Sequence, residues 1–381
     1  MSNNSAGQVN NEKINCRVDW LDLVRSIAII TVVLCHTTES VFYADIYLME
    51  SPTLAARLFA LLFHTVGRIG VPLFLFLTGY LLLDRKYNTA TEVVRFWKTK
   101  LLPLVITYEL WLLIYETYNV LFGNKVFDIK ALICRMLFFQ YSDWSHMWYI
   151  PMIIGVYLML PFVSYLLKAF PSKLFIIPAA ACFFYCFVFP NINIVTPVYK
   201  NTLSLDFTGN VFGLYIVCGY FMKKLIVYLH TALKGKKLKI CIAGLFFMSA
   251  LSFAVVVAFT MICFSKGIAF DLWYDFSLLF ISTVCLFMGI GLIFIDRKVP
   301  LRRVWNKISI SSMGIYFIHA ILVSALSKMN FLGGSPLPRS VKFLVYTVVC
   351  FALSFLISEL LACIPYASQL LLLRKKAVKS K

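Results

Sequence analysis

Charged residues are scarce in this chain. Asp, Glu, Lys and Arg make up only 14% of its 381 residues, whereas 61% are hydrophobic. Soluble globular proteins carry about 25% charged and about 45–50% apolar residues. Such a composition excludes a soluble globular domain and indicates a polytopic membrane protein. The polar connections between the apolar segments are mostly too short for a soluble catalytic domain. Any chemistry must therefore take place within a helical bundle or at its face.

Acidic residues are the rarer charged class, because 17 Asp and Glu stand against 36 Lys and Arg, for a net charge of +19. The basic residues do not form one patch. Most of them lie in the connections on the side of the membrane that carries the N-terminus. This asymmetry is the positive-inside pattern, and it predicts that both termini are cytoplasmic. It argues against a nucleic-acid partner and leaves attraction to anionic membrane lipids as a secondary effect.

The chain also lacks the cysteine and histidine spacings that are typical of metal sites. The 11 cysteines include no Cys-x-x-Cys pair and no Cys/His cluster with the spacing of a metal site. Most of them fall inside apolar segments, where cysteine acts as a small apolar residue. The sequence therefore predicts no metal site.

Apolar segments long enough to cross a bilayer are abundant. A transmembrane helix needs about 20 mainly apolar residues. About ten segments qualify, centred near residues 20–42, 68–83, 101–122, 146–167, 174–190, 208–229, 238–263, 272–295, 308–327 and 341–364. We predict an all-α polytopic transmembrane bundle with about ten spans. The second span is a candidate for extension, because residues 54–65 are also apolar.

The domain organisation is simple. No second domain, long linker, low-complexity tract or short internal repeat is visible. We expect a disordered N-terminal tail over residues 1–16, a membrane-embedded domain over 17–370 and a basic cytoplasmic tail over 371–381.

Two ionisable residues stand in the first apolar segment. Arg25 and His36 are eleven positions apart, which is three helical turns plus roughly 20°, so both side chains share one face. They are separated by roughly 16 Å along the helix axis. Ionisable residues inside a membrane usually mark a functional site. In the alternative reading, Arg25 pairs with Asp22 or reaches toward the interface, and His36 is a satisfied histidine of the bundle.

The second span begins with another cation, Arg68, one turn after His64 on the same face. Packing explains a second intramembrane arginine poorly. Pro72 and Gly79 are expected to bend this span and to permit close helix approach.

Further candidates follow in the fourth and ninth spans. His146 and Trp148 are placed on the outer side and could line a polar mouth, although Trp148 could equally be an interfacial anchor. His319 is one more intramembrane histidine, and spacing alone does not separate a structural role from a functional one.

The ordered motifs resemble the acyltransferase-3 family of integral membrane O-acyltransferases. The first span, "LDLVRSIAIITVVLCH", is similar to the family's signature of an Arg followed by a His. The similarity continues through "RIGVPLFLFLTGYLL", "HMWYIPMIIGVYLMLP", "FGLYIVCGYF" and "SMGIYFIHAIL". It covers nearly the whole chain, and the second motif is most similar to the branch of surface-polysaccharide acetylases. One difference is that Arg95 and Lys98 stand where the family often has Arg-x-x-Arg, and Lys lacks the bidentate fork of Arg.

The resemblance implies acyl transfer from cytoplasmic acyl-coenzyme A, as co-substrate, to a hydroxyl of a cell-surface glycan or lipid-linked sugar outside the cytoplasmic membrane. Acetyl is the first candidate for the acyl group and succinyl the second. No covalently bound cofactor is expected. A transporter or flippase of lipid-linked sugars is the alternative, but transporters often show repeated halves, and this chain shows no such symmetry.

The resemblance also implies roles for the candidate residues. His36 is the expected general base, or a nucleophile that carries the acyl group first. The expected site residues are His36, Arg25 and Arg68 in catalysis; Arg25, Arg68, Arg95 and Lys98 in binding acyl-coenzyme A; and Glu39, His146, Trp148 and His319 on the acceptor side. Glu39 either orients the His36 ring or is a solvated charge near the helix end. Arg68 either stabilises an oxyanion or binds a donor phosphate.

Overall fold

The computed structural model describes residues 18–48, 53–196, 203, 205, 209–268 and 270–374, and every regular element among them is a helix. The first part of the chain contains α1 (Asp19–Tyr47), α2 (Leu54–Arg68), α3 (Gly70–Leu82), α4 (Ala90–Phe96), the π-helix η1 (Trp97–Leu101), α5 (Leu102–Phe122) and α6 (Ile129–Met136). The middle part contains the 3-10 helix η2 (Ser145–Trp148), α7 (Tyr149–Ala169), the 3-10 helix η3 (Ser172–Phe175), α8 (Ile176–Phe183), the π-helix η4 (Phe184–Val188) and α9 (Phe189–Val195). The last part contains α10 (Asn210–Ala232), α11 (Gly235–Ser265), α12 (Ser277–Phe294), α13 (Arg302–Lys328), α14 (Arg339–Ala362) and α15 (Pro365–Leu370).

Nine helical stretches in the described residues are long and apolar enough to cross a membrane. They are Asp19–Tyr47, Leu54–Leu82, Ser145–Ala169, Ser172–Val195, Asn210–Ala232, Gly235–Ser265, Ser277–Phe294, Arg302–Lys328 and Arg339–Ala362. Each corresponds to a predicted span, and the second does extend back to Leu54. The remaining predicted segment, 101–122, forms α5, whose two glutamates and several tyrosines keep it out of this apolar set. The prediction of an all-helical membrane bundle is confirmed.

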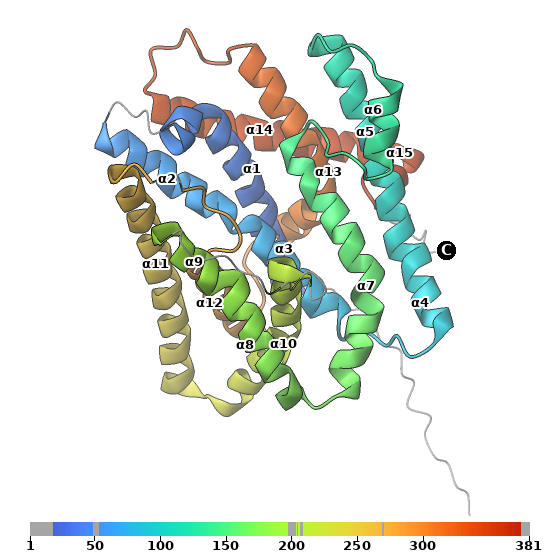
Figure 1. The fold of residues 1–381 in the computed structure, drawn as a ribbon, viewed down its shortest axis with the longest axis vertical. Coiled ribbons are helices and arrows are strands. Elements are labelled where there is room, and N and C mark those ends of the chain that lie inside the picture. Colours follow the sequence, from blue (N-terminus) through green and yellow to red (C-terminus); the bar gives the residue numbers. More distant parts are fainter. Residues whose placement is uncertain are drawn as a thin grey trace, which may run out of the picture.

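Helix α1 lies in the interior of the bundle. It packs against α2, α3, α13 and α14, while α11 and α12 pair with each other to one side (Figure 1). Helices α5 and α6 stand at the opposite margin. Because α1 has neighbours on several sides, most of its polar side chains are buried or partly buried in the bundle.

The second span is broken between α2 and α3. Pro72 has no backbone N–H to offer the carbonyl of Arg68, so the helical hydrogen-bond ladder is interrupted there. Ile69 separates the two helices, and Arg68 is the last residue of α2. The predicted bend is therefore present, and it places the arginine at a helix end inside the bundle.

Two glycines allow α3 and α10 to touch at backbone distance. A Cβ on Gly79 would lie 1.8 Å from the carbonyl oxygen of Ile216, and one on Gly219 would lie 2.3 Å from that of Phe76. The expected close approach at Gly79 is thus observed. The two helices have no room for a side chain at either position.

The expected tails have different outcomes. Residues 1–16 lie outside the described residues, as do 375–381. Residues 371–374, the start of the expected basic tail, pack against the bundle, and Leu372 is only 2% exposed.

Replacing Gly79 by Ala should destabilise the protein by about 1–3 kcal/mol, because the added methyl group forces two backbones apart. Gly155→Ala is the matched control. Gly155 also lies within a helix, but a Cβ there meets nothing within 4 Å, so the change should be neutral or stabilising by up to about 1 kcal/mol. Thermal unfolding of the detergent-solubilised variants measures both effects. Equal melting temperatures would contradict the close packing.

Candidate active site

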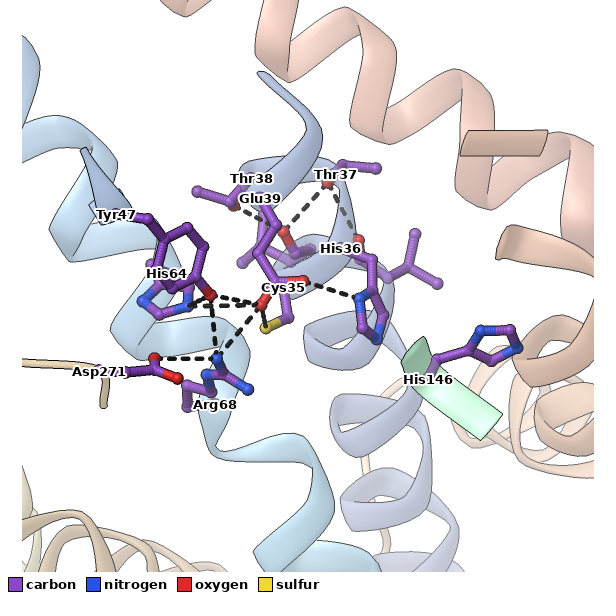
Figure 2. A network of polar contacts seen from close by, with 12 residues as sticks. Cys35, His36, Thr37, Thr38, Glu39, Tyr47, His64, Arg68, His146 and Asp271 are labelled. Atoms are coloured by element: carbon purple, nitrogen blue, oxygen red, sulfur yellow. Dashed lines mark hydrogen bonds and ion pairs between the residues drawn. The ribbon is translucent and has the colours of Figure 1, made fainter. Parts of the chain in front are cut away.

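Glu39 holds the ring of His36 on helix α1. The two residues are one turn apart, and Glu39 Oε2 lies 2.9 Å from His36 Nδ1 (Figure 2). An ionised carboxylate only accepts hydrogen bonds, so Nδ1 carries the hydrogen and donates it. In the neutral ring the lone pair is then on Nε2. His36 is therefore prepared to accept a proton at Nε2, as a general base must.

The other oxygen of Glu39 is the meeting point of side chains from α1 and α2. Arg68 Nη2 lies 3.3 Å from Oε1, the Tyr47 hydroxyl donates to Oε1 at 3.1 Å, and His64 Nε2 is 3.6 Å away. Figure 2 shows the carboxylate between the His36 ring on one side and these three groups on the other. We call Glu39, His36, Arg68, Tyr47 and His64 the Glu39 cluster.

Arg68 is buried and is neutralised from two sides. Besides Glu39, its Nη2 lies 3.5 Å from Asp271 Oδ1 in the segment before α12. Its guanidinium also stands over the Trp273 ring, 5.1 Å from the centroid, in a cation–π contact. The cation is thus fixed in position by two carboxylates and an aromatic face.

A kink in α1 brings Tyr47 to Glu39. Residues eight apart in a straight helix are separated by about 12 Å along the axis, yet these two side chains are in hydrogen-bond contact. The kink lies at Phe42, where φ is −117° and ψ is 27°. Arg339 of α14 fastens it from outside. Its Nη2 donates to the Val41 carbonyl at 2.6 Å and pairs with buried Asp45 at 2.7 Å, and its guanidinium covers the Phe42 ring.

Three histidines from three elements meet beside the Glu39 cluster. The ring centroid of His36 lies 6.1 Å from that of His146 in η2 and 5.3 Å from that of His319 in α13, and the latter two are 5.3 Å apart. The structure thus gathers the three histidines among the expected site residues.

Hydrogen bonds define which nitrogens of His146 and His319 are protonated. The Tyr115 hydroxyl donates its one hydrogen to the Phe317 carbonyl at 2.6 Å, so it must accept from His146 Nε2 at 2.9 Å. His319 Nδ1 donates to the Ile315 carbonyl at 3.1 Å, and its buried Nε2 has no partner among the described residues. In its neutral form, each of the three rings therefore keeps one nitrogen as an acceptor.

Two adjoining cavities are lined by five of the predicted site residues. The smaller, about 40 Å³, is lined by His36, His146, Arg68 and Trp148 among others. The larger cavity has a volume of about 810 Å³, and no Asp or Glu is part of its lining. Four cations line it: Arg25, Arg85, Lys100 and Arg374. Phe74, Tyr149 and Tyr316 belong to the walls of both cavities. Arg25 and His36, which share one helix face, thus line two cavities that share part of their walls.

Comparison with known proteins identifies the family. The model of an acyltransferase domain, the acyltransferase-3 family, matches residues 18–359, nearly the whole chain. The chain belongs to this family. It is a multi-pass membrane O-acyltransferase. No curated protein and no solved structure matches the chain.

In this acyltransferase the remaining candidates lie at different distances from the two cavities. Arg25 donates to Ser309 at 3.1 Å and to Asp22 at 3.4 Å, so the expected contact with Asp22 is present while the side chain lines the larger cavity. Arg95 and Lys98 are exposed and line neither cavity. Lys100, two residues beyond Lys98, lines the larger one.

Other residues of the acyltransferase site escaped sequence reasoning. Tyr47 reaches Arg68 only because α1 is kinked. Asp271 reaches Arg68 from a connection more than 200 residues further along the chain. Nothing in their local sequence marks them. Arg85 and Lys100 looked like ordinary positive-inside residues. Their place on the wall of the larger cavity depends on how α3 and η1 pack.

Three side chains of the acyltransferase lie close enough together to suggest a metal site. One donor atom from each of Cys35, Glu39 and His64 falls within 4.8 Å of the others. The spacing rules applied to the sequence did not reveal this group, because its members come from two helices. The Arg68 guanidinium already neutralises Glu39 at this point, so a metal ion would have to displace it.

Arg339→Gln should lower the rate of acyl transfer by roughly 10- to 100-fold, because a displacement of about 1 Å at a catalytic group can cost about 10²-fold. The change removes the guanidinium that holds the kink, and Tyr47 then loses its position in the Glu39 cluster. Initial rates per amount of folded protein in membranes provide the measurement. Lys342→Gln, one turn further along α14, is the control. Equal rates for the two variants would show that the kink does not position the site.

Proposed function

We propose that this protein transfers an acyl group, acetyl in the first place, from acyl-coenzyme A to a hydroxyl of an extracytoplasmic cell-surface glycan or lipid-linked sugar. The protein would act in the cytoplasmic membrane. One observation carries the proposal. A large cavity lined by cations and by no acid adjoins a small pocket that contains an oriented histidine base.

The larger cavity suits the donor. Coenzyme A combines a polyanionic nucleotide with a long thiol-bearing arm, and arginine and lysine are the usual partners of phosphates. The volume of about 810 Å³ falls within the range of about 300–1,000 Å³ that is typical of ligand sites. The charge pattern of the sequence supports a cytoplasmic location for this end of the bundle, on the side where acyl-coenzyme A is found. In this arrangement Arg25 binds the anionic part, and the arm points along α1 toward His36.

The smaller pocket suits the reaction. His36 Nε2 takes the proton of the acceptor hydroxyl while the hydroxyl oxygen attacks the thioester carbonyl. The carbon–sulfur bond then breaks, and the imidazolium returns the proton to the leaving thiolate. Glu39 stabilises that imidazolium through Nδ1–H. A course through acyl-His36 remains the variant mechanism, and detection of a labelled acyl-enzyme before acceptor is added distinguishes the two.

Arg68 acts at the reacting end in this scheme. It lines the small pocket and not the large one, so its geometry suits the developing oxyanion better than a donor phosphate. His146 and His319 offer acceptor nitrogens beside His36, where the hydroxyls of a sugar would donate. The volume of about 40 Å³ favours acetyl over the longer, charged succinyl group.

His36→Ala should lower transfer of labelled acetyl from acetyl-coenzyme A by at least about 10²-fold, because a general base commonly contributes 10²–10⁴-fold. Membranes of the source cells supply the acceptor, and mass spectrometry of surface glycans detects the added acetyl mass. His230→Ala is the control, since this histidine pairs with Asp296 far along the chain from the site and should retain full activity.

Arg25→Gln in the same assay should raise the KM for acetyl-coenzyme A more than it lowers kcat. Full transfer by the His36 variant would refute the mechanism. An unchanged donor KM in the Arg25 variant would remove that residue from the donor site.

A further inference from the structure

After the last span, the described residues up to 374 stay packed against the bundle. Helix α15 turns back against α5 (Figure 1). Thr107 Oγ1 donates to the Leu370 carbonyl at 2.6 Å, and Trp111 Nε1 donates to the Leu371 carbonyl at 3.0 Å. Leu372 is 2% exposed. Residues 365–374, which we call the C-terminal strap, are therefore fastened to α5 by side chains of that helix.

The end of the strap is turned inward at Leu373. This residue has a left-handed backbone with φ of 53°, which is costly for a side chain with a Cβ and persists only where the surroundings impose it. The Arg374 amide closes the turn by donating to the Ser368 carbonyl at 2.9 Å. The next side chain, Arg374, is thereby directed into the bundle instead of toward solvent.

Arg374 is held in place but its hydrogen-bonding capacity is not exhausted. Its Nη2 pairs with Glu359 and donates to Ser311 at 2.9 Å. Its Nε is buried and has no partner among the described residues. A buried donor without a partner costs about 1–3 kcal/mol and calls for an explanation. Glu359 fixes the orientation of the guanidinium but is not part of the cavity lining.

The strap forms part of the wall of the larger cavity. Gln369, Leu370, Leu373 and Arg374 line it together with Arg25. Even with Glu359 beside Arg374, the wall presents more positive than negative charge. The match to the acyltransferase family ends at residue 359, so the strap lies beyond the part of the chain that the family describes.

We propose that the C-terminal strap completes the donor site of this acyltransferase, with Arg374 as a ligand for a phosphate group of acyl-coenzyme A. The inference rests on the proposed function. The strap supplies a pre-oriented guanidinium, whose planar fork matches phosphate oxygens. It also closes the side of the cavity next to α5. The bonds that anchor the C-terminal strap to α5 then raise the affinity for the donor, while the acyl-transfer step at His36 is left unaffected.

Arg374→Gln tests the ligand role in the full-length protein. We expect the KM for acetyl-coenzyme A to rise by about tenfold or more, as for loss of a charge-assisted hydrogen bond, with kcat and the acceptor KM little changed. Arg374→Lys should restore part of the affinity, because it keeps the charge. Lys237→Gln, an exposed residue that does not line the cavity, removes the same charge and should leave the donor KM unchanged.

Thr107→Val with Trp111→Phe tests the strap without touching Arg374. The double variant removes both bonds to the strap carbonyls, so the donor KM should again rise while kcat persists. Adenosine 3′,5′-bisphosphate, which carries phosphates but no acyl arm, should inhibit the wild type better than either variant.

The outcomes separate the two proposals. If the wild type shows no transfer that depends on acyl-coenzyme A, the proposed function fails. If the wild type transfers acetyl and Arg374→Gln keeps the wild-type donor KM and the wild-type inhibition by the bisphosphate, only the role of the strap is overturned. A fall in kcat alone, with the donor KM unchanged and no rescue by Lys, would also overturn it.

Discussion

The carboxylate of Glu39 is the interaction on which the site depends. An ionised group inside a membrane protein is costly unless charges and hydrogen bonds compensate it. Here both oxygens are used, one by His36 and the other by Arg68 and Tyr47. This single group therefore fixes the protonated nitrogen of His36, holds α2 against α1 and, through Arg68 and Asp271, ties in the segment before α12.

The rest of the molecule keeps the cation-lined cavity apart from the pocket that contains His36. Four cations and no carboxylate line the large cavity, with Arg25 paired to Asp22 and Arg374 paired to Glu359, whereas Arg68 near His36 is neutralised by two carboxylates. Under the proposed function, the polyanionic part of the donor lies in the large cavity and the neutral reacting group lies in the small one. The break at Pro72 and the kink at Phe42 are the two departures from straight helices that make this possible. Each places a polar side chain where a regular helix would not.

The sequence predicts the helical scaffold well and the site in part. Apolar runs locate the spans because the bilayer imposes their length, and the eleven-residue spacing relates Arg25 to His36 because both belong to one helix. His146 and His319 could be nominated as unusual residues, but only the packing of η2 and α13 brings their rings to His36.

Contacts that depend on tertiary structure lie beyond such reasoning. Tyr47 contacts Glu39 only because α1 is kinked, and the kink is held by Arg339 of α14, a helix far along the chain. Arg374 falls in the basic cytoplasmic tail that the sequence predicts for residues 371–381, because a run of basic residues after the last span looks like an ordinary cytoplasmic end. Hydrogen bonds from Thr107 and Trp111 hold this segment against α5, and no local sequence pattern predicts them. Arg95 and Lys98 show the converse, since a motif-like position turned out to be exposed.

Phe74, Tyr149 and Tyr316, the aromatic residues shared by the two cavities, have a consequence for the membrane itself. Under the proposed function the donor and the acceptor come from opposite sides of the membrane, so the bundle must not leak protons and ions. The ring of Tyr149 lies 6.5 Å from that of Phe74 and 5.9 Å from that of Tyr316, and Tyr316 is only 7% exposed. The three aromatic side chains thus form a common wall of the two cavities. A hydrated ion would have to shed its water to pass between such rings, so under the proposed function the same residues would limit ion leakage during acyl transfer.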